Sequence, residues 1–211
     1  MIELNKQTMC VGEQSVAVFS QAYCEADIIV PDVKPDISKI LQADANVVIS
    51  NKICNNDRIT LEGNANINVL YLGDDGNISS INSVQPFSHQ MDVKGASDGM
   101  AVDIETDVEN IDCNTINSRK LNVKVLIGMD ANAVMPVNLA LCTEILDDNE
   151  FETLSKTVKP YRTVARSNDK IAIKERLELP SGKPSISNVL KVDAKVSGKE
   201  TRVVNDKVIV K

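Results

Sequence analysis

The chain contains an internal repeat of domain size. Residues Pro31–Glu62, "PDVKPDISKILQADANVVISNKICNNDRITLE", return without a gap at Pro180–Lys211 as "PSGKPSISNVLKVDAKVSGKETRVVNDKVIVK". The offset is 149 residues, and 11 of the 32 paired positions are identical. One recurrence at this distance is typical of tandem domains, because solenoid repeats recur every 20 to 50 residues or so. We therefore expect one domain at residues 1–155 and the truncated start of a second at residues 156–211.

The two parts of the chain carry opposite charge. Residues 1–155 hold 9 Lys and Arg against 24 Asp and Glu, a net charge of −15, whereas residues 156–211 hold 14 against 6, a net charge of +8. Two surfaces of opposite charge favour specific association with each other. This predicts self-association, in which the basic second repeat docks onto an acidic first repeat within or between chains. The alternative is an ordinary basic surface. The overall charge of −7 argues against binding to nucleic acid.

The dominant hydrophobic period is two, which predicts strands. Apolar and polar residues alternate over residues 59–71, 100–109 and 120–127. We expect the last two segments to be antiparallel neighbours, with carboxylates of the first opposite lysines of the second. The predicted fold class is all-β, as an antiparallel β-sandwich or a partly open barrel. Gly63 interrupts the apolar face of its strand and marks a candidate bulge.

Two segments carry turn signals, and one segment departs from the strand pattern. "CNNDR" at residues 54–58 and "LGDDGN" at residues 72–77 carry the Asn, Asp and Gly residues of hairpin turns. Residues 35–42 instead predict a short helix at one end of the β-structure, because Pro35 suits the first helical position and Ile37, Ile40 and Leu41 share a helical face. We expect Ile37 and Leu41 to be buried.

The cysteines and aromatic residues are read as core residues. The five cysteines form no CxxC pair, so the spacing indicates neither a disulfide framework nor a zinc site, and we expect mostly buried, reduced thiols in a reducing compartment. The few aromatic side chains mostly fall at core-facing positions. No signal peptide or membrane-spanning stretch is expected.

The sequence offers little to support catalysis. No nucleophile–base or phosphate-binding motif is present, and His89, the only histidine, is expected to be a surface or packing residue. The alternating carboxylates of residues 103–109 lie on an open strand face, where general acid–base chemistry has no desolvated pair to use. We expect no enzyme activity, no cofactor and no metal. Arg119 and Lys120, at a strand entry, are read as turn and cross-strand residues or as anchors for a partner.

Several segments together resemble the SPOCS domain of clostridial sporulation proteins. They are "VPDVKPDISKILQADANV", "DRITLEGNANINVLYL", "QPFSHQMDVKGA" and "NSRKLNVKVLIG", which span about Val30–Ile127. The resemblance implies tandem non-catalytic domains, often followed by a C-terminal LysM domain, in proteins that help to assemble the spore envelope. No LysM sequence is present here. The second copy has Ser181 and Ser185 in place of Asp32 and Asp36, so we do not expect the fold to need this acidic pair in both copies, and any further role of the two residues belongs to the first copy.

From the resemblance we expect a structural or adaptor module of spore coat assembly that acts through protein–protein contacts. Its partners would be coat or envelope morphogenesis proteins, and its place the mother-cell cytoplasm at the forespore surface, without membrane insertion. The candidate partner-binding residues are Asp32, Asp36, Arg119 and Lys120. The alternative is a carbohydrate- or peptidoglycan-binding module, although the scarcity of aromatic residues counts against it.

Overall fold

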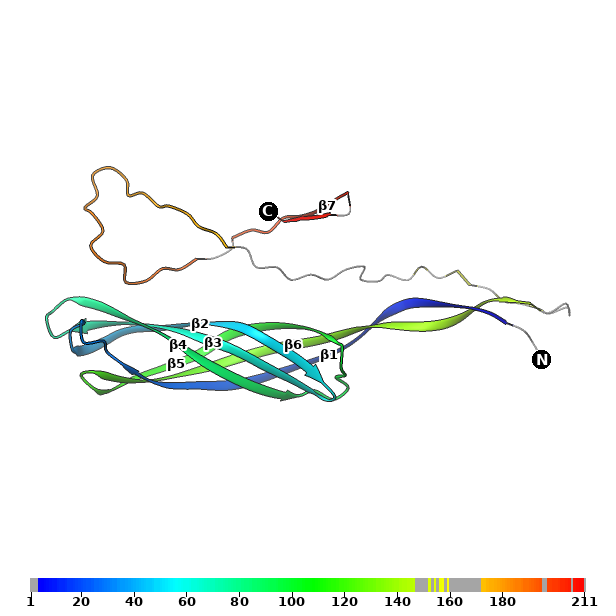
Figure 1. Ribbon diagram of the computed structural model, residues 1–211, viewed down its shortest axis with the longest axis horizontal. Coiled ribbons are helices and arrows are strands. Elements are labelled where there is room, and N and C mark those ends of the chain that lie inside the picture. Colours follow the sequence, from blue (N-terminus) through cyan, green and yellow to red (C-terminus); the bar gives the residue numbers. More distant parts are fainter. Residues whose placement is uncertain are drawn as a thin grey trace.

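The computed structural model describes residues 4–146, 152, 154, 156–157, 159, 172–194, 197–205 and 207–210. These residues form strands and no helix (Figure 1). The strands are β1 (Leu4–Ile29), β2 (Ile37–Asn55), β3 (Arg58–Gly73), β4 (Ile78–Asp92), β5 (Ala101–Asn117), β6 (Lys120–Ile145), β7 (Thr201–Val204) and β8 (Lys207–Val210).

Strands β1 to β6 form two three-stranded antiparallel sheets, and this confirms the predicted sandwich. One sheet has the order β1-β6-β5 and the other β2-β3-β4. Strand β5 lies beside β2 along one edge of the sandwich, and β1 lies beside β4 along the other. The chain therefore leaves the first sheet after β1, builds the whole second sheet as a meander, and returns through β5 and β6.

The core lies between the inner faces of these sheets and follows the period-two pattern. The inward residues of β3 and β6 are fully covered; they include Ile59, Leu61, Ala65, Val69, Tyr71, Leu121, Val123, Val125 and Ile127, each 0% exposed. The central strands β3 and β6 thus carry the best-buried positions. Burying side chains of this kind stabilises a fold by about 1.5–3 kcal/mol each.

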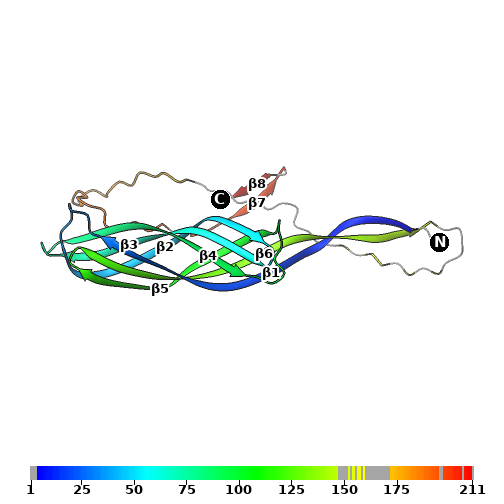
Figure 2. The same cartoon turned by 60° about the horizontal axis from the view of Figure 1, so that its bottom comes forward.

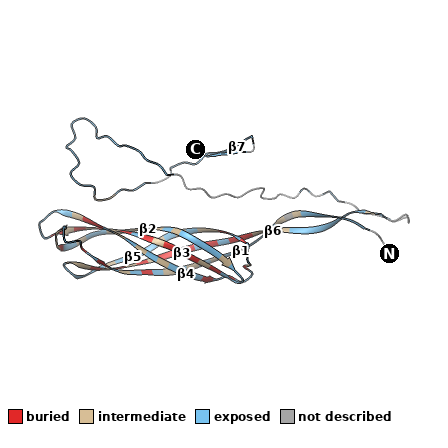
Figure 3. Ribbon diagram, viewed as in Figure 1, coloured by how far each residue is buried: buried red, intermediate tan, exposed pale blue. Residues whose placement is uncertain are grey.

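Strands β1 and β6 continue beyond the sandwich as a two-stranded ribbon. Pairing of β5 with β6 ends at Val134, whereas β1 pairs with β6 as far as Leu4 opposite Ile145. The ribbon is mostly exposed, as its pale blue colour in Figure 3 shows. Its exposed apolar residues include Met9, Leu139 and Leu141.

The short helix expected at residues 35–42 is wrong: the segment enters β2 as a bulged strand. The register shifts between Ile37 and Lys39, and again between Ile40 and Gln42. Each bulge adds one residue, so Ile37 and Ile40 face the core three positions apart, a spacing that imitates a helix. Ile37 is 7% exposed, but Leu41 is the extra residue of the second bulge and is 48% exposed. The expected burial of Leu41 is therefore also wrong.

Both hairpin turns are confirmed. Asp57 takes a positive φ of 56° between β2 and β3, and Gly76 one of 78° between β3 and β4. The bulge expected at Gly63 lies across from it, on β2, where the register shifts between Ile49 and Asn51. Phe87 of β4 pairs with Gly63, and its ring occupies the space that a Gly63 side chain would need.

The antiparallel pairing of β5 with β6 is confirmed, but its charge pattern differs from the expected one. Asp112 lies opposite Lys124, whereas Glu105 lies opposite Asp130. The turn at Ser118–Arg119 sets this register, so Asp103, Glu105 and Asp107 lie opposite residues 128–132, beyond the lysines of β6. The lysines of β6 instead meet carboxylates of β1, and Glu25 of β1 is the register partner of Lys124.

Two expectations about burial need correction. Of the five free cysteines only Cys24 is buried: Cys10, Cys54 and Cys113 are half-buried and Cys142 is exposed. The aromatic side chains likewise include both buried and exposed ones. Tyr71 is buried and Phe87 packs against the core, but Phe19 and Tyr23 are 55% and 63% exposed on β1. Phe151 and Tyr161 lie outside the described residues.

The second repeat reproduces two local structures of the first. A turn closed by Lys34 N donating to Pro31 O (2.9 Å) recurs as Lys183 N donating to Pro180 O (3.3 Å). The β7–β8 hairpin, visible in Figure 2, pairs Thr201 with Val210 and Val204 with Lys207. Shifted by 149 residues, this is the register of β2 and β3 at their shared turn, where residue 52 pairs with 61 and residue 55 with 58. The sequence repeat is therefore also a repeat of local structure.

Candidate functional site

The candidate site lies at one end of the sandwich, around the two-residue turn between β5 and β6. Ser118 and Arg119 form this turn, and the connection from β1 to β2 crosses it at residues 30–36. Backbone hydrogen bonds join the two segments: Val30 N donates to Arg119 O at 2.9 Å, and Ile37 N donates to Ser118 O at 2.7 Å. The crossing therefore ties the first sheet to the start of the second.

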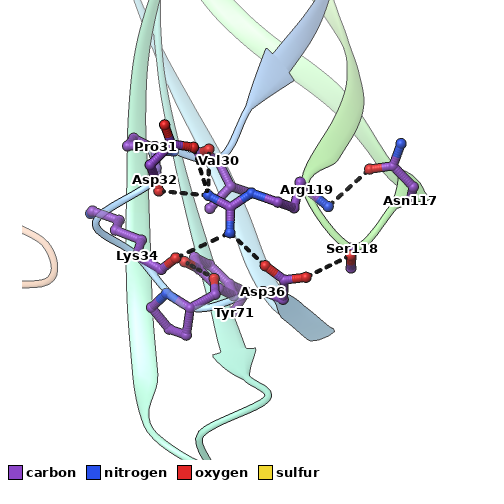
Figure 4. Close-up of polar contacts among 10 residues, drawn as sticks. Val30, Pro31, Asp32, Lys34, Asp36, Tyr71, Asn117, Ser118 and Arg119 are labelled. Carbon is purple, nitrogen blue, oxygen red and sulfur yellow. Dashed lines mark hydrogen bonds and ion pairs between the residues drawn. The ribbon is translucent and has the colours of Figure 1, made fainter.

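The Arg119 guanidinium is the centre of the site (Figure 4). Its Nη2 donates to the carbonyl oxygens of Val30 (3.1 Å) and Pro31 (3.0 Å) and lies 3.4 Å from Asp32 Oδ1. Its Nη1 donates to Asp36 Oδ1 at 2.5 Å and to Lys34 O at 3.4 Å. A planar fork of donors suits this task, because one side chain can hold several oxygens of a curved segment.

Asp36 receives a second hydrogen bond in the site. Ser118 Oγ donates to Asp36 Oδ2 at 2.8 Å, so both carboxylate oxygens are bound. The hydrogen bond from Arg119, and then the one from Ser118, lower the pKa of the Asp36 carboxyl from its usual value. The same bond to Asp36 raises the pKa of Arg119. Both groups are ionised at neutral pH and form a charge-assisted pair at the surface.

Three contacts fix the segment behind this pair. Tyr71 Oη donates to Pro35 O at 3.0 Å, and burial raises the pKa of that phenol. The Pro35 ring lies over Gly73, where an added Cβ would come within 2.7 Å of it. Asp74 N donates to Asp36 O at 2.9 Å. The position of the Asp36 carboxylate is therefore set by the backbone on both sides.

The structure thus brings three of the four candidate residues together and places the fourth beside them. Arg119 contacts both Asp32 and Asp36. Lys120 binds Asp27 of β1 instead, with Nζ 2.7 Å from Oδ2. The Asp32 side chain is fully exposed, at 105%, whereas those of Arg119 and Asp36 are 35% and 36% exposed. Arg119 and Asp36 hold the fold together, Lys120 is held by Asp27 and is 37% exposed, and Asp32 leaves a fully exposed carboxylate at the surface.

Sequence reasoning missed two polar contacts near the sandwich. The Lys34 ammonium donates to Ser80 O on β4. The identity of Lys34 and Lys183 in the two repeats was a signal for a structural role. The second contact joins Ser20 Oγ of β1 to His89 Nε2 of β4 at 2.8 Å, and burial lowers the pKa of His89. Ser20 carried no sequence signal, because the pairing depends on how the two sheets meet.

The hollows of the described surface are open. One lies over the outer face of β1, β5 and β6 and is lined by Phe19, Asp103, Glu105 and Asp130, among others. A second lies over the outer face of β2, β3 and β4 and is partly covered by residues 189–193. Within the residues that the structure describes, no group of three or more His, Cys, Asp or Glu could hold a metal ion. The same residues include no helix long and apolar enough to cross a membrane.

The comparison with protein families identifies the domain. Residues 36–116 match the family model described as "SipL, SPOCS domain". The chain contains a SPOCS domain. The matched range runs from the residue before β2 to the end of β5, so the SPOCS match covers the whole second sheet and β5. It includes Asp36 but ends before Arg119. No curated protein and no solved structure matches the chain.

Proposed function

We propose that this chain is a non-catalytic structural or adaptor module of spore envelope assembly, acting through protein–protein contacts. The SPOCS match carries this proposal, because it relates the chain to sporulation. The geometry supports an interaction module in two ways. The sandwich presents broad, open sheet faces, and its clustered charged residues are engaged in holding turns together. Folds of this kind host many functions, so the fold alone does not choose between them and the family match is the main support for this proposal.

The partner surface that we propose is the end of the sandwich around Asp32 and Lys120. Asp32 presents an exposed carboxylate, and the Lys120–Asp27 ion pair lies beside the Arg119–Asp36 pair that holds the backbone in place. Val33, at the tip of the same turn, is 92% exposed. An exposed apolar residue on a rigid turn, with charges at its rim, has the composition of a protein-binding anchor. The partners would be coat or envelope morphogenesis proteins at the forespore surface in the mother cell.

Site-specific crosslinking in sporulating cells tests this function. A photoreactive amino acid replaces Val33 at the proposed surface, and a matched one replaces Ile53, which is 45% exposed near the other end of β2. We expect crosslinks from position 33 to a spore envelope protein, and a fluorescent fusion to gather at the forespore surface. A fusion spread through the cell, together with equal crosslinking from both positions, would contradict the proposal.

One observation favours the alternative, a carbohydrate- or peptidoglycan-binding module. Phe19 and Tyr23 are exposed on β1, four residues and thus about 13 Å apart along the strand. The Lys124 ammonium lies 4.2 Å from the centre of the Tyr23 ring. Glu105 and Asp130 line the hollow beside Phe19. Exposed aromatic rings with carboxylates nearby provide stacking surface and hydrogen-bond acceptors for sugars.

Titration with soluble peptidoglycan fragments discriminates between the two functions. The adaptor function predicts no saturable binding, and equal behaviour of the native chain and a Phe19→Ala, Tyr23→Ala double variant. Both residues are exposed, so the double variant keeps the core intact. Saturable binding that this variant loses would reverse the ranking of the two functions.

A further inference from the structure

The second repeat contacts the first through a short segment. Residues 189–193 lie over the outer face of β2, β3 and β4, where they cover part of an open hollow. Lys191 Nζ lies 2.6 Å from Asp44 Oδ2 on β2. Asn68 Nδ2 on β3 donates to Leu190 O at 3.3 Å. Leu190 and Lys191 are half-buried, unlike their exposed neighbours at 172–189.

The face that receives this segment is polar and continuous across three strands. In register, Asp44 of β2 lies opposite Asn68 of β3, which lies opposite Asn82 of β4. The next row is Asn46, Asn66 and Val84. Such a face offers hydrogen-bond donors and acceptors to a strand laid on it, in addition to the charge of Asp44.

Asn68 joins this face to the covering segment. Its Nδ2 donates to Asn82 Oδ1 at 2.6 Å and to Leu190 O at 3.3 Å, so one amide group contacts both β4 and the second repeat. Its Oδ1 is buried without a hydrogen-bond partner among the described residues, and a buried acceptor without a donor is costly. The contacts of Leu190 and Lys191 therefore have to offset this cost.

The contact joins corresponding segments of the two repeats. With the offset of 149 residues, Lys191 corresponds to Gln42 and Asp193 to Asp44. In the first repeat the Gln42 amide donates to the Asp44 carboxylate at 2.7 Å, so both side chains lie on the outer face of β2. In the second repeat Lys191 lies 3.3 Å from Asp193 in the same way. Lys191, which meets Asp44, therefore occupies the position of the second repeat that corresponds to Gln42 on this outer face.

We propose that the second repeat docks on the outer face of β2 of the first repeat through the segment that corresponds to β2 in sequence, with Lys191 bound to Asp44. The occupant of the face is the second repeat of the same chain. One position of the repeat decides which repeat can bind Asp44. It is Gln42 in the first repeat and Lys191 in the second, so only the second repeat offers a cation there. Two first repeats would bring Asp44 carboxylates together without a cation. The net charges of −15 for residues 1–155 and +8 for residues 156–211 favour the same pairing.

Hydrogen exchange on the whole chain tests the contact, with Lys191→Glu as the main variant. This residue lies outside the sandwich, so the substitution leaves the fold of the first repeat intact. We expect backbone amides of residues 186–194 to exchange about two- to fivefold faster, as for the loss of one surface ion pair. Lys199→Glu, an equal charge change at an exposed position of the same repeat, serves as the control and leaves the exchange unchanged. Unchanged exchange in Lys191→Glu would overturn the proposal.

A charge swap tests the specific pair. Asp44→Lys alone should also speed exchange at residues 186–194, and combining it with Lys191→Glu should restore protection. Circular dichroism of Asp44→Lys checks that the sandwich remains folded. If this variant unfolds, the experiment is repeated with Asp44→Asn and Lys191→Gln. A double variant no more protected than the single ones would refute the pairing of Asp44 with Lys191.

Dependence on protein concentration identifies the occupant. We expect a monomeric mass by light scattering and protection of residues 186–194 that does not change on dilution. Protection that disappears on dilution, together with a dimeric mass, would show that a second copy occupies the face and would overturn the proposal in its stated form.

Discussion

Arg119 Nη1 lies 2.5 Å from Asp36 Oδ1, and this pair joins the turn between β5 and β6 to the start of β2. The two residues are 83 positions apart in the chain. They belong to segments of different sheets, so their contact fixes how the two layers of the sandwich meet at this end. The guanidinium also binds the carbonyl oxygens of Val30 and Pro31.

Replacing Arg119 should destabilise the domain more than replacing an ordinary surface arginine. Arg119→Lys keeps the charge but loses the fork that binds several oxygens, so we expect a lower melting temperature, and a further decrease for Arg119→Ala. Arg58→Ala is the control, because the Arg58–Asp92 pair is exposed and long, at 3.3 Å. Thermal melts followed by circular dichroism measure the effect. Equal melting of the Arg119 and Arg58 variants would contradict this role.

A side chain at Gly63 should be poorly tolerated. An added Cβ would come 2.8 Å from Val48 O and 2.9 Å from Phe87 Cε1, so Gly63→Ala must move backbone as well as the ring. We expect a loss of about 1–3 kcal/mol in the free energy of unfolding, measured by urea denaturation. At Gly12 an added Cβ meets nothing within 4 Å, so Gly12→Ala is the matched control. Similar losses at both glycines would exclude this explanation.

Ile37 and Leu41 should behave differently although they are only four residues apart. Ile37 is 7% exposed and faces the core, so Ile37→Ala should cost about 2–5 kcal/mol of stability. Leu41 is 48% exposed at a bulge, and Leu41→Ala should stay within about 0.5 kcal/mol of the native chain. Urea denaturation of the two variants checks the bulged strand directly. Large and equal losses would favour a helical segment instead.

Burial of His89 should give the stability a pH dependence. Its pKa is lower in the folded chain than its usual value of about 6.5, so the unfolded chain binds more protons between these two values. The stabilisation is complete above about pH 6.5 and declines as the pH falls toward the lowered pKa. His89→Gln should remove this slope from urea midpoints measured between pH 7.5 and pH 5, values chosen to bracket the usual pKa of about 6.5. An unchanged slope would assign the dependence to other groups.

The alternation of apolar residues was enough to predict the sheets but not their irregularities. Residues such as Leu61 and Val125 could be placed in the core because strand side chains alternate between two faces. Bulges break this rule without a clear signal, and the one between Ile37 and Lys39 gave Ile37 and Ile40 a helical spacing. The position of the β5–β6 turn, which alternation does not encode, placed the carboxylates of β5 beyond the lysines of β6.

The residues of the candidate site could be named from the sequence, but their contacts could not. All four positions carried a signal in the sequence. Asp32 and Asp36 change between the repeats, and Arg119 and Lys120 form a basic pair. That Arg119 reaches both aspartates follows from the crossing of the β1–β2 connection over the β5–β6 turn. Such long-range placement depends on tertiary packing, which local patterns do not encode. The exposure of Phe19 and Tyr23 was missed for the same reason.

The pairing of β1 with β6 has a consequence for the order of folding. The strands β2, β3 and β4 form a meander of neighbours and can pair as they are made, whereas β1 must wait until Lys120 and the residues after it have been synthesised. At about 5–20 residues per second, this delay lasts on the order of 5–20 s. During that time β1 is an unpaired strand that another copy's β6 could capture, and exchange of such strands between chains is a characteristic failure of repeat proteins. Of the sandwich strands, β1 is thus the one that waits longest for its partner.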